Sequence, residues 1–206
     1  MQVRRSRGDQ MPATRQGESD TPSRILDVAE RLVQRRGFNG FSYADVAREL
    51  GLTKASLHYH FAGKAELGEA LIGRYTGTFA DALVAIDQRP ADAPSKLRNY
   101  ALLYADVLRN ERMCLCGILA AEYETLPQAM RDSVIRFFGD NEAWVQRVIE
   151  QGLKEGTLRC EGSTGEAARA IVSGLEGAML VARPFGDIGR FEATANRMIG
   201  DLVIER

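Results

Sequence analysis

The segment from Ser42 to Lys64, SYADVARELGLTKASLHYHFAGK, constrains the fold more than any other part of this chain. Ser42 can cap a short helix, with Asp45 three residues on as its acidic N3 residue. Gly51 then supplies a position where the backbone turns left-handed without steric cost. Thr53 is a strong N-cap for a second helix. Two short helices around a tight turn form a helix-turn-helix, whose second helix lies in the major groove of DNA.

The second helix combines an inward apolar side with a polar outer face. Leu57 and Phe61 lie four residues apart and therefore share one side of the helix. Both histidines of the chain, His58 and His60, fall on this short helix. A surface helix that happens to carry histidine would explain each residue singly, but it would not explain the turn glycine and the cap that accompany them. We therefore predict that the outer face contacts DNA; it holds Lys54, Ser56, His58, Tyr59 and His60.

The residues around this motif resemble the N-terminal DNA-binding domain of the tetracycline-repressor (TetR) family. The resemblance covers Ile25 to Leu67 and rests on three stretches, RRGFNGFS, DVARELGLTKASL and YHFAGKAEL. It implies an all-α protein, with an N-terminal three-helix DNA-binding domain and a C-terminal helical domain for ligand binding and dimerisation. His58 departs from the family pattern, which usually has tyrosine there, although imidazole can also donate to phosphate.

The resemblance also assigns roles to the residues of the motif. Those expected at base edges are Lys54, Ala55 and Ser56; those expected at phosphates are Tyr59, His60 and Lys64; those flanking the surface are Ser42, Tyr43 and Thr53. The implied function is that of a transcriptional regulator, a repressor released from its operator by an unknown small-molecule effector. A homodimer paired through its last two helices would read a pseudo-palindrome, with half-sites about one helical turn apart.

Composition narrows the class of protein further. The net charge of −1 over 206 residues excludes a uniformly basic nucleic-acid coat, but residues 1–64 hold 11 basic and 7 acidic side chains, whereas the remainder holds 16 and 21. This asymmetry suggests that the N-terminal part is the one that meets a nucleic acid. An ordinary solvated surface explains so small an excess of positive charge equally well. Three cysteines, no apolar run of about 20 residues and no signal-peptide core predict a cytoplasmic protein without disulfides or membrane contact.

Three regions follow along the chain. Residues 1–20 are predicted to be a disordered basic tail, either solvated or an arm that reaches the minor groove. Residues 21–66 form the helix-turn-helix domain, whose first helix starts with Thr21 as N-cap and Pro22 as the first helical residue. Residues 67–206 form the ligand-binding and dimerisation domain. Helical spacing of apolar residues predicts further helices over residues 64–86, 95–110, 116–124, 127–156, 164–183 and 188–204.

Enzyme motifs are scarce in this sequence. There is no Walker loop, no GxGxxG after a strand and no HExxH. Because both histidines lie on the predicted DNA face, the larger domain lacks a base for a Ser-His or Cys-His arrangement. Three cysteines without a neighbouring imidazole do not make a structural zinc site, which needs four ligands. We expect no enzyme activity, no metal and no cofactor.

Cys114 and Cys116 are open to two interpretations. The stretch MCLCGILAAEYETLP resembles one in a subset of TetR-like regulators, where a cysteine opens the sixth helix. A cysteine at a helix N-terminus can have a lowered pKa, because the free N–H groups favour thiolate, and Arg112 would add positive potential. Cys114 would then sense electrophiles or oxidants, or serve a helical thiol enzyme. Alternatively, both cysteines are small packing residues.

Two further sets of residues carry predictions for the larger domain. The family resemblance implies a ligand pocket, for which the candidates are Tyr100, Tyr104, Cys114, Phe137, Asn141, Trp144 and Met179; plain core packing is the alternative. The last two helices carry small residues on successive turns, which permit close helix approach in a dimer or inside one subunit; they are Gly174, Gly177, Ala178 and Ala182. The residues expected to add apolar area there are Leu175, Met179, Phe191, Met198, Ile199 and Leu202.

Overall fold

A computed structural model describes residues 20–204, which contain nine α-helices, two short 3-10 helices and no β-strand beyond an isolated bridge between Leu158 and Val203. The all-α fold class is therefore confirmed. The predicted tail lies outside the described residues, apart from its last position. The elements are α1 (Thr21–Arg36), α2 (Tyr43–Leu50), α3 (Lys54–His60), α4 (Lys64–Gln88), α5 (Ala93–Arg109), α6 (Leu115–Ala121), η1 (Tyr123–Thr125), α7 (Gln128–Glu155), α8 (Thr164–Ala182), η2 (Arg183–Phe185) and α9 (Ile188–Gly200).

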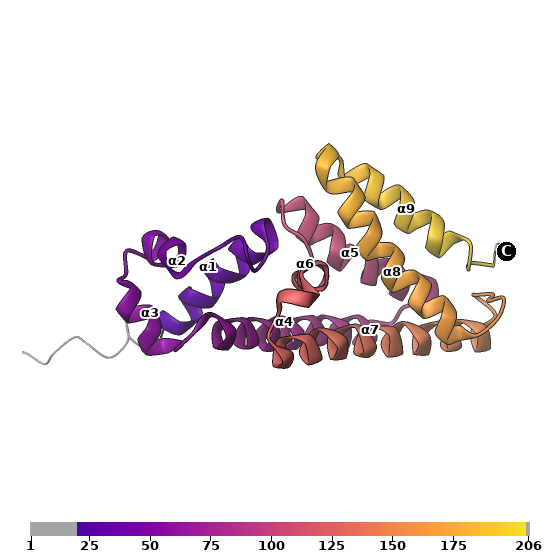
Figure 1. Cartoon of the computed structure of the whole chain (residues 1–206). Helices are drawn as coiled ribbons and strands as arrows, with labels where there is room; N and C mark the ends of the chain where they lie inside the picture. Colours follow the sequence, from indigo (N-terminus) through magenta and orange to yellow (C-terminus); the bar gives the residue numbers. More distant parts are fainter. Residues whose placement is uncertain (1–19, 205–206) are drawn as a thin grey trace, which may run out of the picture.

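The helices are arranged as a small head on a larger helical body. Figure 1 shows α1, α2 and α3 together at one end of the molecule, while α8 and α9 lie toward the other. The helix α4 leaves the head and runs beside α7 along the body, and it also packs on α1, α5 and α6. Because α4 is one continuous helix from Lys64 to Gln88, the boundary predicted after residue 66 falls inside it. A shift of α4 would therefore displace residues in both the head and the body.

Helix ends follow local capping, with small departures from the predicted positions. Asp20, rather than Thr21, occupies the N-cap position of α1, and Gly37 ends that helix at φ +83°. The helix α5 starts two residues earlier than predicted, because the side chain of Asp92 caps it by accepting from the backbone N–H of Ser95 at 2.9 Å. The segment predicted as one helix over residues 116–124 is divided into α6 and η1.

The small residues of α8 do not share one surface. A Cβ atom at Gly174 would overlap the side chain of Met198 on α9, and Ala182 is 1% exposed, so both serve packing inside the subunit. Gly177, by contrast, has open space where a side chain would lie. Most of the apolar residues predicted to widen a dimer interface are buried in this subunit instead, which corrects that prediction; they are Leu175, Met179, Phe191 and Ile199.

The exposed apolar surface of α8 lies near its C-terminal end. Leu180 and Val181 are each 61% exposed, and Phe185 in the following 3-10 helix is 60% exposed. Gly177 precedes Leu180 by three residues and Val181 by four, so it lies on the same side of the helix. Helical periodicity alone did not single out this patch, because leucine and valine continue the same apolar run that fills the core.

Candidate nucleic-acid interface

The turn between α2 and α3 is built from short-range contacts. The carboxylate of Asp45 accepts from the backbone N–H of Ser42 at 2.9 Å and from its hydroxyl at 2.7 Å, and these hydrogen bonds lower the pKa of Asp45 to about 2. Gly51 adopts φ +66° and ψ +27°, the left-handed conformation predicted from the sequence. Thr53 Oγ1 accepts from the backbone N–H of Ser56 at 3.1 Å. The predicted capping and turn chemistry is thus present, and it fixes where α3 begins.

The inner side of α3 is anchored by packing and by one buried hydroxyl. Leu57 is 0% exposed and Phe61 8% exposed. The buried Tyr43 donates its hydroxyl to the carbonyl of Phe61 at 3.0 Å, and its ring lies 4.7 Å from that of His58, centroid to centroid. The phenol of Tyr43 therefore holds the end of α3 and is turned away from the outer surface. Nδ1 of His58 lies 3.1 Å from the carbonyl oxygen of Ala62; because a carbonyl only accepts, Nδ1 carries the proton.

The outer side of α3 projects into solvent. Tyr59 is 85% exposed, the highest value among the large apolar side chains that are exposed, and its ring lies 5.1 Å from that of His60. Lys54, Ala55 and His58 are exposed, whereas Ser56 and His60 are half-buried. Packing inside this chain gives no reason for an exposed tyrosine beside a lysine and two histidines. The face is available for a partner, as a recognition helix must be.

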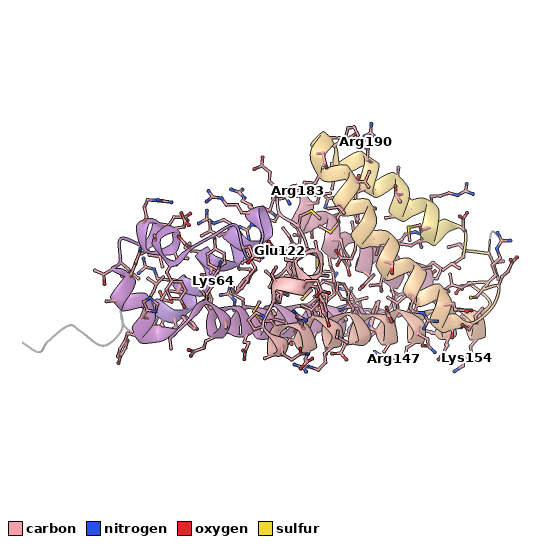
Figure 2. All side chains as sticks on the ribbon, in the orientation of Figure 1. Lys64, Glu122, Arg147, Lys154, Arg183 and Arg190 are labelled. Atoms are coloured by element: carbon pink, nitrogen blue, oxygen red, sulfur yellow. The ribbon has the colours of Figure 1, made fainter. Side chains whose placement is uncertain are left out.

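Several of the predicted contacts meet around one surface hollow of about 350 Å³. The residues from the predicted DNA-binding set that line it are Ser42, Tyr43, Lys54, His58 and Lys64. Lys64 Nζ donates to the carbonyl of Phe41 at 2.7 Å and lies 4.4 Å from the centroid of that ring, and burial lowers its pKa. Its ammonium keeps two further donors. Figure 2 shows Lys64 within the head of the molecule. Lys54 at the start of α3 and Lys64 at the start of α4 meet beside the N-terminus of α2 and form a cationic hollow suited to a phosphate.

Family models match both parts of the chain. Residues 25–71 match the model of bacterial regulatory proteins of the tetR family, and residues 93–198 match that of the tetracyclin repressor-like C-terminal domain. The chain belongs to the TetR family. The family resemblance predicted from the sequence is therefore confirmed. It extends over the C-terminal region as well as the helix-turn-helix.

Individual relatives of this TetR-family chain agree with that assignment. The HTH-type transcriptional repressor DhaR of a Mycobacterium strain is 25% identical over 169 residues, which cover 78% of this chain and 82% of DhaR. A TetR-family regulator from Agrobacterium tumefaciens has a similar structure, with a TM-score of 0.87, 29% identity, and coverage of 90% of this chain and 99% of that one. A regulator from Saccharomonospora viridis, solved in complex with choline, gives a TM-score of 0.77 at 27% identity, with coverage of 91% and 100%.

The residues predicted to line a ligand pocket of this TetR-family protein form a hydrogen-bonded aromatic cluster. The hydroxyls of Tyr100 and Tyr104 lie 2.8 Å apart, and Tyr100 also donates to Oδ1 of Asn141 at 3.1 Å. Trp144 stacks on Tyr100 with ring centroids 5.4 Å apart, and Asn141 donates to the carbonyl of Phe137 at 2.7 Å. Met179 is fully buried. The structure thus brings five of the predicted residues together through ring contacts and hydrogen bonds; they are Tyr100, Tyr104, Phe137, Asn141 and Trp144.

Cys114 opens α6 as predicted, since its sulfur accepts from the backbone N–H of Gly117 at 3.4 Å. Of the two interpretations of Cys114, the one that requires a lowered pKa is contradicted. Cys114 is 1% exposed and Cys116 0% exposed, and burial, reinforced by the nearby carboxylate of Glu176, raises the pKa of both thiols well above the ordinary value. Desolvation of the thiolate outweighs the favourable helix terminus. The cysteines therefore have the properties of packing residues, not of an activated sensor.

Sequence reasoning missed the residues that join the two parts of this TetR-family chain. Gln34, at the end of α1, accepts through its carbonyl from the backbone N–H of Met113 at 3.1 Å. Glu122, after α6, accepts from the backbone N–H groups of Phe38 and Asn39. Gln34 makes this contact with its backbone carbonyl, which no residue type reveals, and the partners of Glu122 lie more than 80 residues away in the sequence. Only the tertiary structure shows that they hold the head to the body.

Metal and membrane sites receive no support from the described part of the chain. Between residues 20 and 204, no group of three or more His, Cys, Asp or Glu side chains is placed to hold a metal ion. Over the same residues, none of the helices combines the length and the apolar character that a membrane crossing requires.

Proposed function

We propose that this chain is a transcriptional repressor that binds a pseudo-palindromic operator as a homodimer and leaves it when a small-molecule effector binds. The exposed face of α3 carries this proposal. Tyr59 and Lys54 project from a helix whose other side is anchored, and the cationic hollow lies beside them. That arrangement suits a helix in the major groove, with flanking lysines on the phosphates. The relationship to a protein named as a repressor supports the direction of control.

A homodimer through α8 and α9 is the assembly that the exposed surface favours. The patch of Leu180, Val181 and Phe185 lies beside Gly177, whose open surface lets a second helix approach closely. Exposed apolar patches of this kind usually mark an interaction site. Two-fold pairing through α8 and α9 would leave the outer face of α3 in both subunits free to meet one DNA duplex, as a pseudo-palindrome requires.

An effector in the body of the protein is supported by a relative. The Saccharomonospora viridis regulator was solved with choline, a small organic ligand, and its chain is covered in full by the match. The residues predicted to contact the ligand are Tyr100, Tyr104, Cys114, Phe137, Asn141, Trp144 and Met179. The buried hydroxyl groups of Tyr100 and Tyr104 and the amide of Asn141 are hydrogen-bonded to one another, so a ligand that reached them would have to replace those hydrogen bonds.

A gel-shift assay with the DNA upstream of the chain's own gene tests the DNA-binding proposal. The wild type should retard this fragment, and Lys64→Gln should weaken binding to all sequences alike. It should also reduce the magnitude of the salt-dependence slope by about 0.9 per subunit, the value for one lost phosphate contact. Lys154→Gln is the matched control, because Lys154 is exposed at the far end of α7 (Figure 2). An unchanged slope in Lys64→Gln would remove this lysine from the interface, and no retardation by the wild type would refute the proposal.

A further inference from the structure

Unpaired polar atoms point to a second functional site. Among the described residues, three buried side-chain atoms have no hydrogen-bond partner, namely Gln34 Oε1, Arg112 Nε and Glu176 Oε1. Burial of a donor or acceptor without a partner destabilises the folded state, so most such atoms in proteins are paired. Gln34 and Arg112 line the same pocket. A single ligand in this pocket could therefore form hydrogen bonds with both Gln34 Oε1 and Arg112 Nε.

The pocket lies where the head meets the body. It has a volume of about 290 Å³ and is enclosed by α1, α4, α5 and the segment between α5 and α6. Its apolar wall is formed by Tyr75, Phe79, Leu103 and Val107. At roughly 30 Å³ per water-sized group, it would hold about ten non-hydrogen atoms. This is the size of one substituted aromatic ring or a short acyl chain.

The charges around the pocket favour an anion. Of its two carboxylates, Glu30 is paired with Arg74, which also pairs with Asp27, and Asp106 is paired with Arg109, which also pairs with Glu192. Among the described residues, Arg112 Nε has no hydrogen-bond partner, and the guanidinium cannot lose its charge. Arg112 is therefore the one charged side chain of the described pocket lining without a partner of opposite charge. A carboxylate is the partner that guanidinium geometry matches best.

We propose that this pocket binds a small organic carboxylate that also carries a hydroxyl or amide donor. The carboxylate accepts from Arg112 Nε, the donor serves Gln34 Oε1, and the apolar body of the ligand lies against Tyr75 and Phe79. Such a ligand would supply both missing hydrogen bonds and leave no polar group of its own unpaired. A neutral molecule of the same shape would leave the Arg112 charge uncompensated.

The position of the pocket would couple this ligand to DNA binding; this part of the inference rests on the proposed function. Gln34 belongs to α1 of the head, and its carbonyl accepts from Met113 of the body at 3.1 Å. Tyr75 and Phe79 contact the predicted ligand-contacting cluster on their other side, with ring centroids of Phe79 and Phe137 5.2 Å apart. A molecule held between the two parts would bind one relative orientation better than the other, and only such a difference can shift the equilibrium.

Calorimetry with the full chain in the absence of DNA tests the site itself. The probes are benzoate, 3-hydroxybenzoate, 4-hydroxybenzoate and the neutral isostere benzamide. Benzoate should bind with a Kd on the order of 1 mM or tighter, in the range expected for ten atoms. At least one hydroxybenzoate should bind about two- to tenfold more tightly, the value of one hydrogen bond. Absence of saturable binding by all the carboxylates, or equal binding of benzamide and benzoate, would overturn the proposal.

Three variants assign the two polar contacts. Arg112→Met should weaken carboxylate binding by about tenfold or more, the usual value of a hydrogen bond to a charged group. Gln34→Met should remove the preference for the hydroxybenzoate over benzoate, because the ligand's hydroxyl loses its acceptor. Arg98→Met is the matched control, an exposed arginine on α5 outside the pocket lining. If circular dichroism shows that Arg112→Met does not fold, Arg112→Lys replaces it, because lysine keeps the charge but loses the Nε–H.

A second measurement separates this site from the DNA-binding proposal. Saturation with the tighter hydroxybenzoate should weaken binding to the upstream DNA, and the DNA should weaken probe binding by the same factor, as linkage requires. Probe binding that leaves DNA affinity unchanged would contradict the coupling but not the site. Failure of the chain to bind DNA would refute the proposed function while leaving the calorimetric result intact.

Discussion

The carboxylate of Glu122 accepts a hydrogen bond from the backbone N–H of Phe38 at 2.6 Å, across 84 residues of sequence. The same carboxylate lies 3.3 Å from the backbone nitrogen of Asn39, and the amide of Asn39 donates to the hydroxyl of Thr125 at 2.7 Å. Figure 2 shows Glu122 at the border between the head and the body. The body thus holds the DNA-binding part by its main chain, directly after α1.

Removing this carboxylate should loosen the head. Glu122→Ala leaves the N–H groups of Phe38 and Asn39 without their acceptor, which should lower the free energy of unfolding by about 1–3 kcal/mol. Urea denaturation followed by circular dichroism measures the change. Glu124→Ala is the control, since Glu124 is exposed two residues further on and should stay near the wild-type value. Equal stability of both variants would show that the contact does not contribute.

The turn before α3 should depend on glycine for its conformation. Gly51 has φ +66° and open space around the missing side chain, so the cost of Gly51→Val is conformational, about 1–2 kcal/mol or more. DNA affinity should fall by at least tenfold while the chain still dimerises. Gly156→Val is the matched control, because Gly156 has the same φ of +66° and equally open surroundings in the body. Wild-type DNA affinity in Gly51→Val, or equal loss in both variants, would contradict the role of this turn.

Dimerisation should fail before folding when Gly177 is enlarged. Inside one subunit nothing lies within 4 Å of a Cβ atom at this position, so Gly177→Leu should fold and keep its helical circular dichroism. Overpacking at a close helix contact costs about 1–3 kcal/mol, which should shift sedimentation toward the monomer. Gly139→Leu, another helical glycine with open surroundings on α7, should remain a dimer. A stable dimer in both variants would locate the interface elsewhere.

Glu176 should make stability depend on pH. Burial raises the pKa of this carboxyl to about 7, so the folded chain binds a proton that the unfolded chain releases at lower pH. The slope of the unfolding free energy against pH is therefore negative between about pH 4.5 and 7, and stability is lost as the pH rises through the folded pKa. Glu176→Gln imitates the protonated form and should lack this dependence. Urea titrations at pH 5 and pH 8 check it; parallel behaviour of both proteins would contradict it.

Local chemistry explains what could be predicted from the sequence. Ser42, Gly51 and Thr53 act within three or four residues of themselves, so a motif read along the chain gives their roles correctly. The same holds for Cys114 as the residue that opens α6. Its pKa could not be predicted in this way, because burial and a carboxylate 62 positions away on α8 decide it. Proximity to a helix terminus is local, but desolvation is a property of the whole fold.

Equivalent residues can have opposite environments for reasons that a sequence does not contain. Gly174 and Gly177 are both small and lie one turn apart on α8, yet Gly174 faces Met198 on α9 and Gly177 faces solvent. Packing of α9 against α8 covers Gly174 but not Gly177. Gln34 on α1 and Arg112 after α5 likewise look like ordinary polar residues in the sequence, and only the folded structure shows that they line one pocket. Tertiary placement, not residue type, identifies these sites.

Fluorescence anisotropy with two DNA fragments measures whether this chain binds DNA with sequence specificity. One fragment carries the region upstream of the chain's own gene, and the other has the same base composition in scrambled order. We expect one dimer to bind each site of the upstream fragment, about a thousandfold or more tighter than it binds the scrambled fragment at physiological salt. Equal affinity for the two fragments would contradict it, because α3 would then contribute no sequence-specific contact.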